Sequence, residues 1–131
     1  MGFHFIYSGR MEMSLNEVID RYSILLLKKE RLPENNALLK ECVRFEKDIL
    51  RHEDQKYIQE KIVLLKEVNG KIWDLESDIR KGKEGELGLE EVGRRALVIR
   101  DLNAERIRLK NRIAEEVGEF GDIKIDHASD L

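Results

Sequence analysis

The segment from Asn69 to Lys110 constrains the fold of this 131-residue chain more than any other part of it. It contains two stretches whose apolar residues recur every three or four positions, which is the repeat of an amphipathic helix. Between them lie three glycines within seven residues, interspersed with Lys and Glu. Such a composition is typical of an exposed turn. The segment therefore predicts two helices folded back on each other as an antiparallel hairpin.

The apolar seam of this hairpin is interrupted by polar residues. Asn69 and Glu76 in the first helix, and Arg106 in the second, occupy positions where a simple bundle carries Leu or Ile. A buried polar group without a partner costs roughly 1–3 kcal/mol. These side chains must therefore bond to one another or line a pocket whose ligand completes their hydrogen bonds. Both interpretations stay open from the sequence.

If the two helices fold back on each other about Gly85, two residues whose numbers add up to about 171 lie side by side across the hairpin. This pairing of positions is called the level rule below. Asn69 then lies close to Asn103 and Arg106, which predicts a central polar cluster. We expect Asp20, in an earlier helix, to be the acidic partner of Arg106.

A second polar cluster is predicted nearer the turn of the hairpin. The same level rule brings Glu76 within reach of Arg95 or Arg94. The first helix of the hairpin also carries Trp73, the only tryptophan of the chain. It is interpreted as a large core anchor, with a ligand-stacking role as the alternative.

The chain before the hairpin predicts further helices. Ser14 and Glu17 have the spacing of a capping box at the start of a helix that runs to about Leu32, where Pro33 stops it. Glu17 therefore has a structural role on this interpretation, with a metal or catalytic role as the alternative. Asn35 or Asn36 caps the second helix.

The domain boundaries follow from these signals. The polar segment 51–56 predicts a break near Glu53, before a third helix from about residue 55 to 81. The fourth helix ends at Gly118. Residues 1–13 are expected to be an N-terminal extension, either poorly ordered or forming a short edge strand, and residues 119–131 an extended tail. The helical domain then spans residues 14–118.

Composition supports an all-α fold. Charged residues make up 39% of the chain and aromatic residues 6%, and there is one proline. We predict an antiparallel bundle of three to four helices, with coiled-coil-like packing, a long helical hairpin and a short extended C-terminal tail.

Charge and hydropathy narrow the range of partners. The formal net charge is −3 with acids and bases intermixed, which argues against nucleic acid. No run of about 18 apolar residues occurs, so no membrane span is expected. The single cysteine, Cys42, cannot form an internal disulfide, which fits a cytoplasmic setting.

Three segments of the chain resemble a family of small bacterial α-helical proteins known as a domain of unknown function. They are SLNEVIDRYSIL from Ser14, N-x-x-x-W-x-x-E-x-x-x-R from Asn69, and L-N-x-x-R-x-x-x-K from Leu102. The resemblance implies a single α-helical domain and no established activity. It marks a candidate polar site of nine residues: Glu17, Asp20, Asn69, Trp73, Glu76, Arg80, Asn103, Arg106 and Lys110.

The leading functional hypothesis is a non-enzymatic interaction module without a cofactor, which forms a homo-oligomer or binds a protein partner. The alternative is a Mg²⁺-dependent hydrolase acting on a nucleotide or another phosphorylated small molecule. Glu17 and Asp20 have the one-turn spacing by which all-α nucleotide pyrophosphohydrolases hold Mg²⁺, and Glu76 would join them from a facing helix. A helical mutase similar to chorismate mutase is a third hypothesis. Its long first helix conflicts with Pro33.

Overall fold

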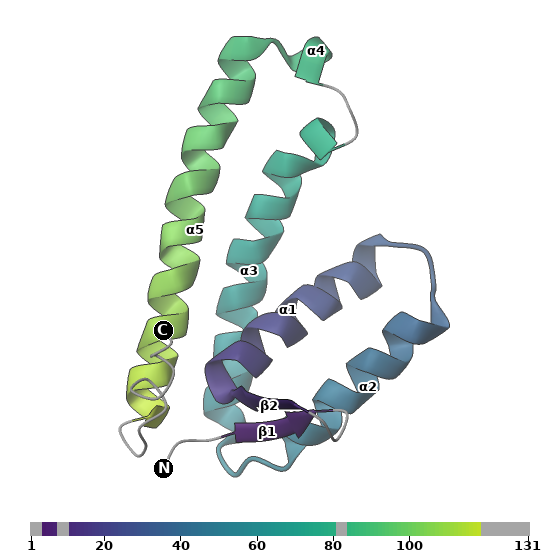
Figure 1. Cartoon of the computed structure of the whole chain (residues 1–131), viewed down its shortest axis with the longest axis vertical. Helices are drawn as coiled ribbons and strands as arrows, with labels where there is room; N and C mark the ends of the chain where they lie inside the picture. The colour runs from purple at the N-terminus through teal and green to yellow at the C-terminus, as the bar shows by residue number, and fades with distance from the viewer. Residues whose placement is uncertain (1–3, 8–10, 81–83, 119–131) are drawn as a thin grey trace.

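The computed structural model describes residues 4–7, 11–80 and 84–118 of the chain. The fold is all-α, as predicted, with one short strand pair at the N-terminal end of the described chain (Figure 1). The elements in order are β1 (His4–Tyr7), β2 (Met11–Ser14), α1 (Leu15–Arg31), α2 (Asn36–Leu50), α3 (Gln55–Arg80), α4 (Glu84–Leu87) and α5 (Leu89–Gly118). None of the described helices combines the length and apolar character that crossing a membrane requires.

The two long helices α3 and α5 run antiparallel, side by side, and form the predicted hairpin (Figure 1). Helix α1 crosses this hairpin obliquely and contacts both of its helices, while α2 packs mainly against α1. The strands β1 and β2 pair antiparallel, with His4 opposite Ser14, and lie against α1 and α2. Helix α1 is therefore the element that joins all layers of the bundle.

The hydrophobic core lies where α1 crosses the hairpin. Its fully buried side chains come from α1, α2, α3 and the C-terminal end of α5. The largest are Leu15, Ile19, Ile49, Ile58, Leu65 and Ile113. Met13 is buried with them, so the strand pair in the stretch 1–13 contributes to the core. Cys42 is buried too, as a small apolar side chain.

The break between the second and third helices is confirmed. The side-chain oxygen of Asn35 accepts a hydrogen bond from the Leu38 amide at 3.1 Å and caps α2. Asp54 accepts one from the Tyr57 amide at 3.1 Å and caps α3. The Gln55 side chain donates to the carbonyl of Ile49 at 2.7 Å, which fixes the turn between the two helices.

The predicted capping box at the start of α1 is wrong. Ser14 does hold the extended backbone of an N-cap residue, at φ −72° and ψ 159°, but its side chain makes no capping hydrogen bond. The Glu17 carboxylate points to Lys110 of α5, whose ammonium lies 2.8 Å away. The ammonium of Lys110 thus binds the carboxylate that a capping box would use to accept from the Ser14 amide. The predicted end of the helix before Pro33 is confirmed.

Glycines shape the hairpin at two places. A Cβ atom at Gly70 would lie 3.3 Å from Nη2 of Arg31 and 3.5 Å from Cδ2 of Leu27, so the glycine lets α1 pass close to α3. Gly88 has φ +85°, a backbone conformation that favours glycine, and its carbonyl accepts from the Val92 amide as α5 begins. The turn, expected to be a plain connector, includes the short helix α4. The expected tail, 119–131, lies outside the described residues.

Candidate functional site

The centre of the candidate site is the carboxylate of Asp20, which is buried where α1 faces α3 and α5. Only 1% of this residue is exposed. Arg106 donates to it from Nε to Oδ1 at 3.1 Å and from Nη2 to Oδ2 at 2.6 Å. Two parallel bonds of this kind are the strongest pairing that a guanidinium and a carboxylate make. The predicted partnership of Asp20 and Arg106 is confirmed.

Asn69 completes this arrangement from α3. Its side-chain amide donates to Oδ1 of Asp20 at 3.1 Å and to the hydroxyl of Ser23 at 3.0 Å. The Ser23 hydroxyl in turn donates to the backbone carbonyl of Asp20 at 2.6 Å. Asp20, Ser23, Asn69 and Arg106 thus form a closed set of hydrogen bonds, called the polar network below. Three helices contribute to it, so it fixes their relative register.

The charges around Asp20 determine its protonation. Burial alone would raise the pKa of this carboxyl group. The hydrogen bonds from Arg106 and Asn69, together with the positive charges of Arg106 and Lys110, outweigh burial and lower the pKa. The pKa of Arg106 is raised, chiefly by its hydrogen bond to Asp20 and against the effect of burial. The pair is therefore ionised on both sides around neutral pH.

Lys110 and Glu17 form a second ion pair one turn away. The Lys110 ammonium lies 2.8 Å from Glu17 and 3.6 Å from Oδ2 of Asp20. Glu17 also faces Arg21 at 3.7 Å along α1. Both carboxylates considered as weak metal ligands on α1 thus have basic partners. In the part of the chain that the structure describes, no three His, Cys, Asp or Glu side chains are grouped as a metal site would need.

A recess of about 210 Å³ lies next to the polar network, between α1, α3 and α5. Its apolar lining comes from Ile24, Leu27 and Ile72. Its polar and aromatic lining consists of Asn69, Trp73, Glu76, Asn103 and Arg106. This space, called the polar recess below, contains five of the nine candidate residues. The network and the pocket that the sequence left as alternatives are therefore both present and share Asn69 and Arg106.

The candidate residues have different positions in this arrangement. Asn103 lines the polar recess and takes no part in the polar network. Trp73 lies half-buried beside Arg31, whose guanidinium carbon is 5.7 Å from the ring centre. Arg80 is the last residue of α3, and its side chain lies outside the described part of the structure.

The second predicted cluster, of Glu76 with Arg95, is replaced by a different one. Arg95 binds Glu91 at 2.8 Å within α5, and its Nη1 lies 3.6 Å from Asp78 and 3.4 Å from the Leu75 carbonyl of α3. The level rule is therefore correct, but the α3 partner is Asp78. Glu76 instead faces the polar recess.

Ser23 is the member of the polar network that sequence reasoning missed. It is fully buried and lies three residues after Asp20. Residues at this spacing share one face of a helix, so an acid followed by a serine in α1 was the available signal.

Comparison of the chain with protein-family models, with curated protein sequences and with solved structures gives no match.

Proposed function

We propose that this chain is a non-enzymatic helical module that associates with a second copy of itself through the outer part of its hairpin. This outer hairpin consists of residues 73–80 of α3 and 89–103 of α5. The observation that carries the proposal is the uneven burial of the two long helices. The described part of α3 has no fully buried residue after Ile72, and α5 has none before Ile113.

The outer hairpin nevertheless carries a full apolar seam. Its half-buried side chains are Leu75, Ile79, Val92, Val98, Ile99 and Leu102. Helices α1 and α2 lie beside the lower part of the hairpin (Figure 1) and border the outer part only along the polar recess, where Arg31 contacts Trp73 and Asp74. A two-helix unit buries its apolar residues poorly by itself, and two such units that pack together form a four-helix bundle.

Size and charge favour a second copy as the partner. Residues 89–103 of α5 span about 22 Å, and two adjacent helices are about 20 Å wide, so the face measures roughly 440 Å² per copy, a size typical of weak, reversible association. The outer part of α3 carries the acids Asp74, Glu76 and Asp78 and one base, Arg80, whereas residues 89–103 of α5 carry three acids and three bases. If two copies pack with α3 of one against α5 of the other, the acidic helix therefore faces a helix without net charge, and no like-charge repulsion opposes the contact.

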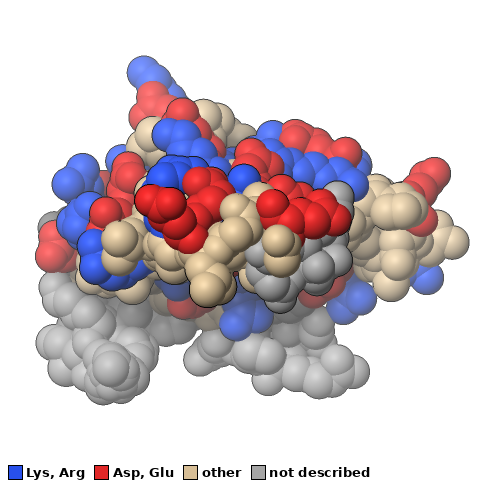
Figure 2. Space-filling model, turned by 90° about the horizontal axis from the view of Figure 1, so that it is seen from above, with Lys and Arg blue, Asp and Glu red and all other residues tan. Residues whose placement is uncertain are grey.

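Other classes of function have less support from the geometry. Acidic and basic side chains are intermixed on the face shown in Figure 2, without a continuous basic area of the kind that follows a nucleic-acid backbone. The hydrolase alternative requires Glu17 and Asp20 as metal ligands, and these two carboxylates bind Lys110 and Arg106. We therefore do not propose the hydrolase.

Sedimentation of the purified chain over a range of concentrations tests the proposal. Ala96 is exposed and lies seven residues, or two helical turns, before Asn103. Both residues therefore lie on the same side of α5, which faces α1 at the level of Asn103. Ala96→Glu should shift the equilibrium to monomer by at least about tenfold in Kd, because it places a charge in the interface. Ala104→Glu is the matched control, since exposed Ala104 lies outside the outer hairpin and about 100° around the helix from Asn103. A chain that is monomeric at every accessible concentration would refute the proposal.

A further inference from the structure

We propose that the polar recess binds a small amino-carboxylate, with the carboxylate at Arg106 and Asn103 and the ammonium at Glu76. In the described structure, Arg106 and Asn103 have unused hydrogen-bond donors at one end of the polar recess. A guanidinium has five N–H groups, and Asp20 uses those on Nε and Nη2 of Arg106. Within the described part of the chain, Nη1 of Arg106 and the side-chain amide of Asn103 take no part in a hydrogen bond.

The charge balance of the polar network permits an incoming anion at this end. Asp20 neutralises Arg106, and Glu17 neutralises Lys110, so the buried part of the site carries no excess charge. A ligand carboxylate then gains hydrogen bonds from Arg106 and Asn103 without breaking the bond of Arg106 to Asp20. The site is thus built before the ligand arrives, which reduces the entropy lost on binding.

Glu76 provides the complementary charge at the other end of the polar recess. It lies seven residues after Asn69 on the same helix, a separation of about 10 Å along the axis. Because the side chains at both ends reach inward, the two charged groups of the ligand lie less than about 10 Å apart. A carboxylate accepts several hydrogen bonds at once, so Glu76 can receive an ammonium alongside its other contacts.

The volume and the walls set the size of the ligand. A cavity of about 150 Å³ holds a benzene molecule, so the 210 Å³ of the polar recess suits about eight or nine non-hydrogen atoms. Ile24, Leu27 and the Trp73 ring provide an apolar wall between the charged ends. A short methylene chain that joins a carboxylate to an ammonium matches this wall.

The test uses 5-aminopentanoate as the probe and the fluorescence of Trp73 as the readout. Trp73 is the only tryptophan of the chain and lines the polar recess, so its emission reports on occupancy. We expect a saturable change with a Kd of about 1 mM or below. Pentanoate and pentylamine each lack one charged group and should bind at least about fivefold more weakly.

Two variants test the assigned contacts without removing the partner of Asp20. Asn103→Leu and Glu76→Gln should each weaken the binding of 5-aminopentanoate by at least about fivefold. Asn111→Leu and Glu105→Gln are the matched controls, because both residues are exposed on α5 and lie outside the polar recess. These controls should leave the Kd unchanged. Circular dichroism of each variant shows whether its helices are retained.

Two results would overturn the inference. One is the absence of a saturable change in the folded chain up to about 50 mM probe, well above the expected Kd. The other is binding that Asn103→Leu and Glu76→Gln leave unchanged relative to their controls. Neither result affects the proposed self-association, which is measured separately by sedimentation.

Discussion

Arg106 of α5 binds Asp20 of α1 through two parallel hydrogen bonds across 86 positions of sequence. Asp20 is 1% exposed, and the Arg106 side chain is 30% exposed. The carboxylate therefore depends on the guanidinium and on Asn69 for the bonds that water would otherwise supply. This contact, together with the apolar core, holds α1 against the hairpin.

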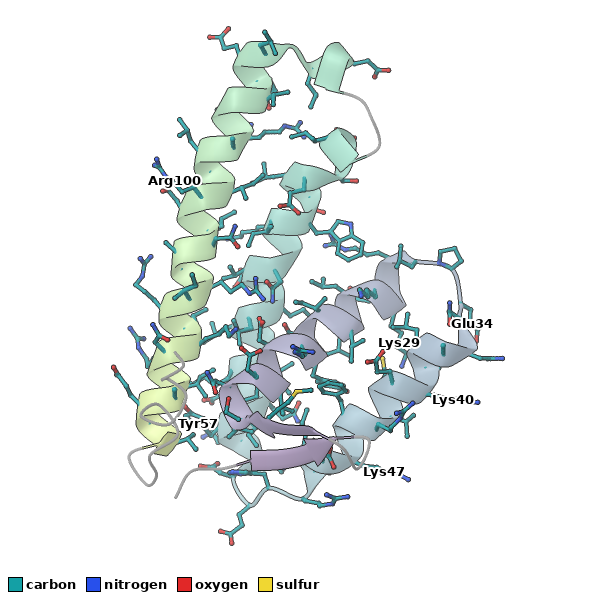
Figure 3. All side chains as sticks on the ribbon, in the orientation of Figure 1. Lys29, Glu34, Lys40, Lys47, Tyr57 and Arg100 are labelled. Atoms are coloured by element: carbon teal, nitrogen blue, oxygen red, sulfur yellow. The ribbon has the colours of Figure 1, made fainter. Side chains whose placement is uncertain are left out.

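Asp20→Asn should lower the free energy of unfolding by about 2–4 kcal/mol. Breaking a buried ion pair costs about 3–5 kcal/mol, and the partial exposure of Arg106 reduces this figure. Urea unfolding followed by circular dichroism measures the change. Asp101→Asn provides the control, because Asp101 and its partner Arg100 are 72% and 69% exposed, and Arg100 lies on the side of α5 turned away from α3 (Figure 3). That substitution should change the stability by less than about 0.5 kcal/mol. Equal effects of the two substitutions would contradict the role given to Asp20.

The pH dependence of stability should carry a contribution from Asp20. Its pKa is lowered in the folded chain relative to the ordinary value of 3.8, so the unfolded chain binds more protons in this range. The stabilisation is therefore complete above pH 3.8 and is lost as the pH falls through the lowered pKa. Unfolding by urea at several pH values below about 5 measures this loss. Asp20→Asn should show a shallower acid dependence than the unchanged chain, and identical slopes would rule out the assignment.

Much of the fold could be predicted because its signals are local. The apolar repeat of the hairpin, the stop at Pro33 and the cap at Asn35 each depend on residues within a few positions of one another. The level rule placed Arg95 opposite Glu76, and Arg95 does contact α3 next to that position, at the Leu75 carbonyl and at Asp78, because antiparallel helices of equal rise keep their register.

The predictions that were wrong concern which partner a charged side chain binds, because this depends on how the helices are packed and rotated. Glu17 matches a capping box by sequence, but Lys110 lies 93 positions away and binds the same carboxylate. Arg95 lies next to Asp78 and not Glu76. These two acids are two positions apart on α3, so their side chains point in different directions around the helix. The polar recess was also not predictable in shape, because it depends on the angle at which α1 leaves the hairpin.

Because α1 passes close to α3 at Gly70, replacing this glycine by alanine should stabilise the chain less than the same change at Gly93. Gly93→Ala should raise the stability by about 0.5–1 kcal/mol, because no atom lies within 4 Å of the added Cβ and alanine favours the helix. Gly70→Ala should gain less, since its Cβ would lie 3.3 Å from Nη2 of Arg31. Arg31 is held there by Asp74 at 2.6 Å, so moving it has a cost. Thermal unfolding of both variants provides the comparison. An equal gain in stability for both variants would show that Arg31 and α1 move aside without a cost in free energy.

Amide hydrogen exchange should be slow in the buried part of the hairpin and faster in the outer hairpin. The buried residues of α3 up to Ile72 and of α5 from Ile113 lie in the core, and their amides should exchange only on global unfolding. Amides of the outer hairpin have few buried neighbours and should exchange at least about tenfold faster in dilute samples, where the chain is monomeric. Raising the protein concentration should slow exchange in the outer hairpin and leave the core unchanged, because a second copy covers only the former. Ala96→Glu should abolish this concentration dependence, whereas Ala104→Glu should preserve it. Uniform protection along both helices of the dilute chain would show that the outer hairpin is stable without a partner.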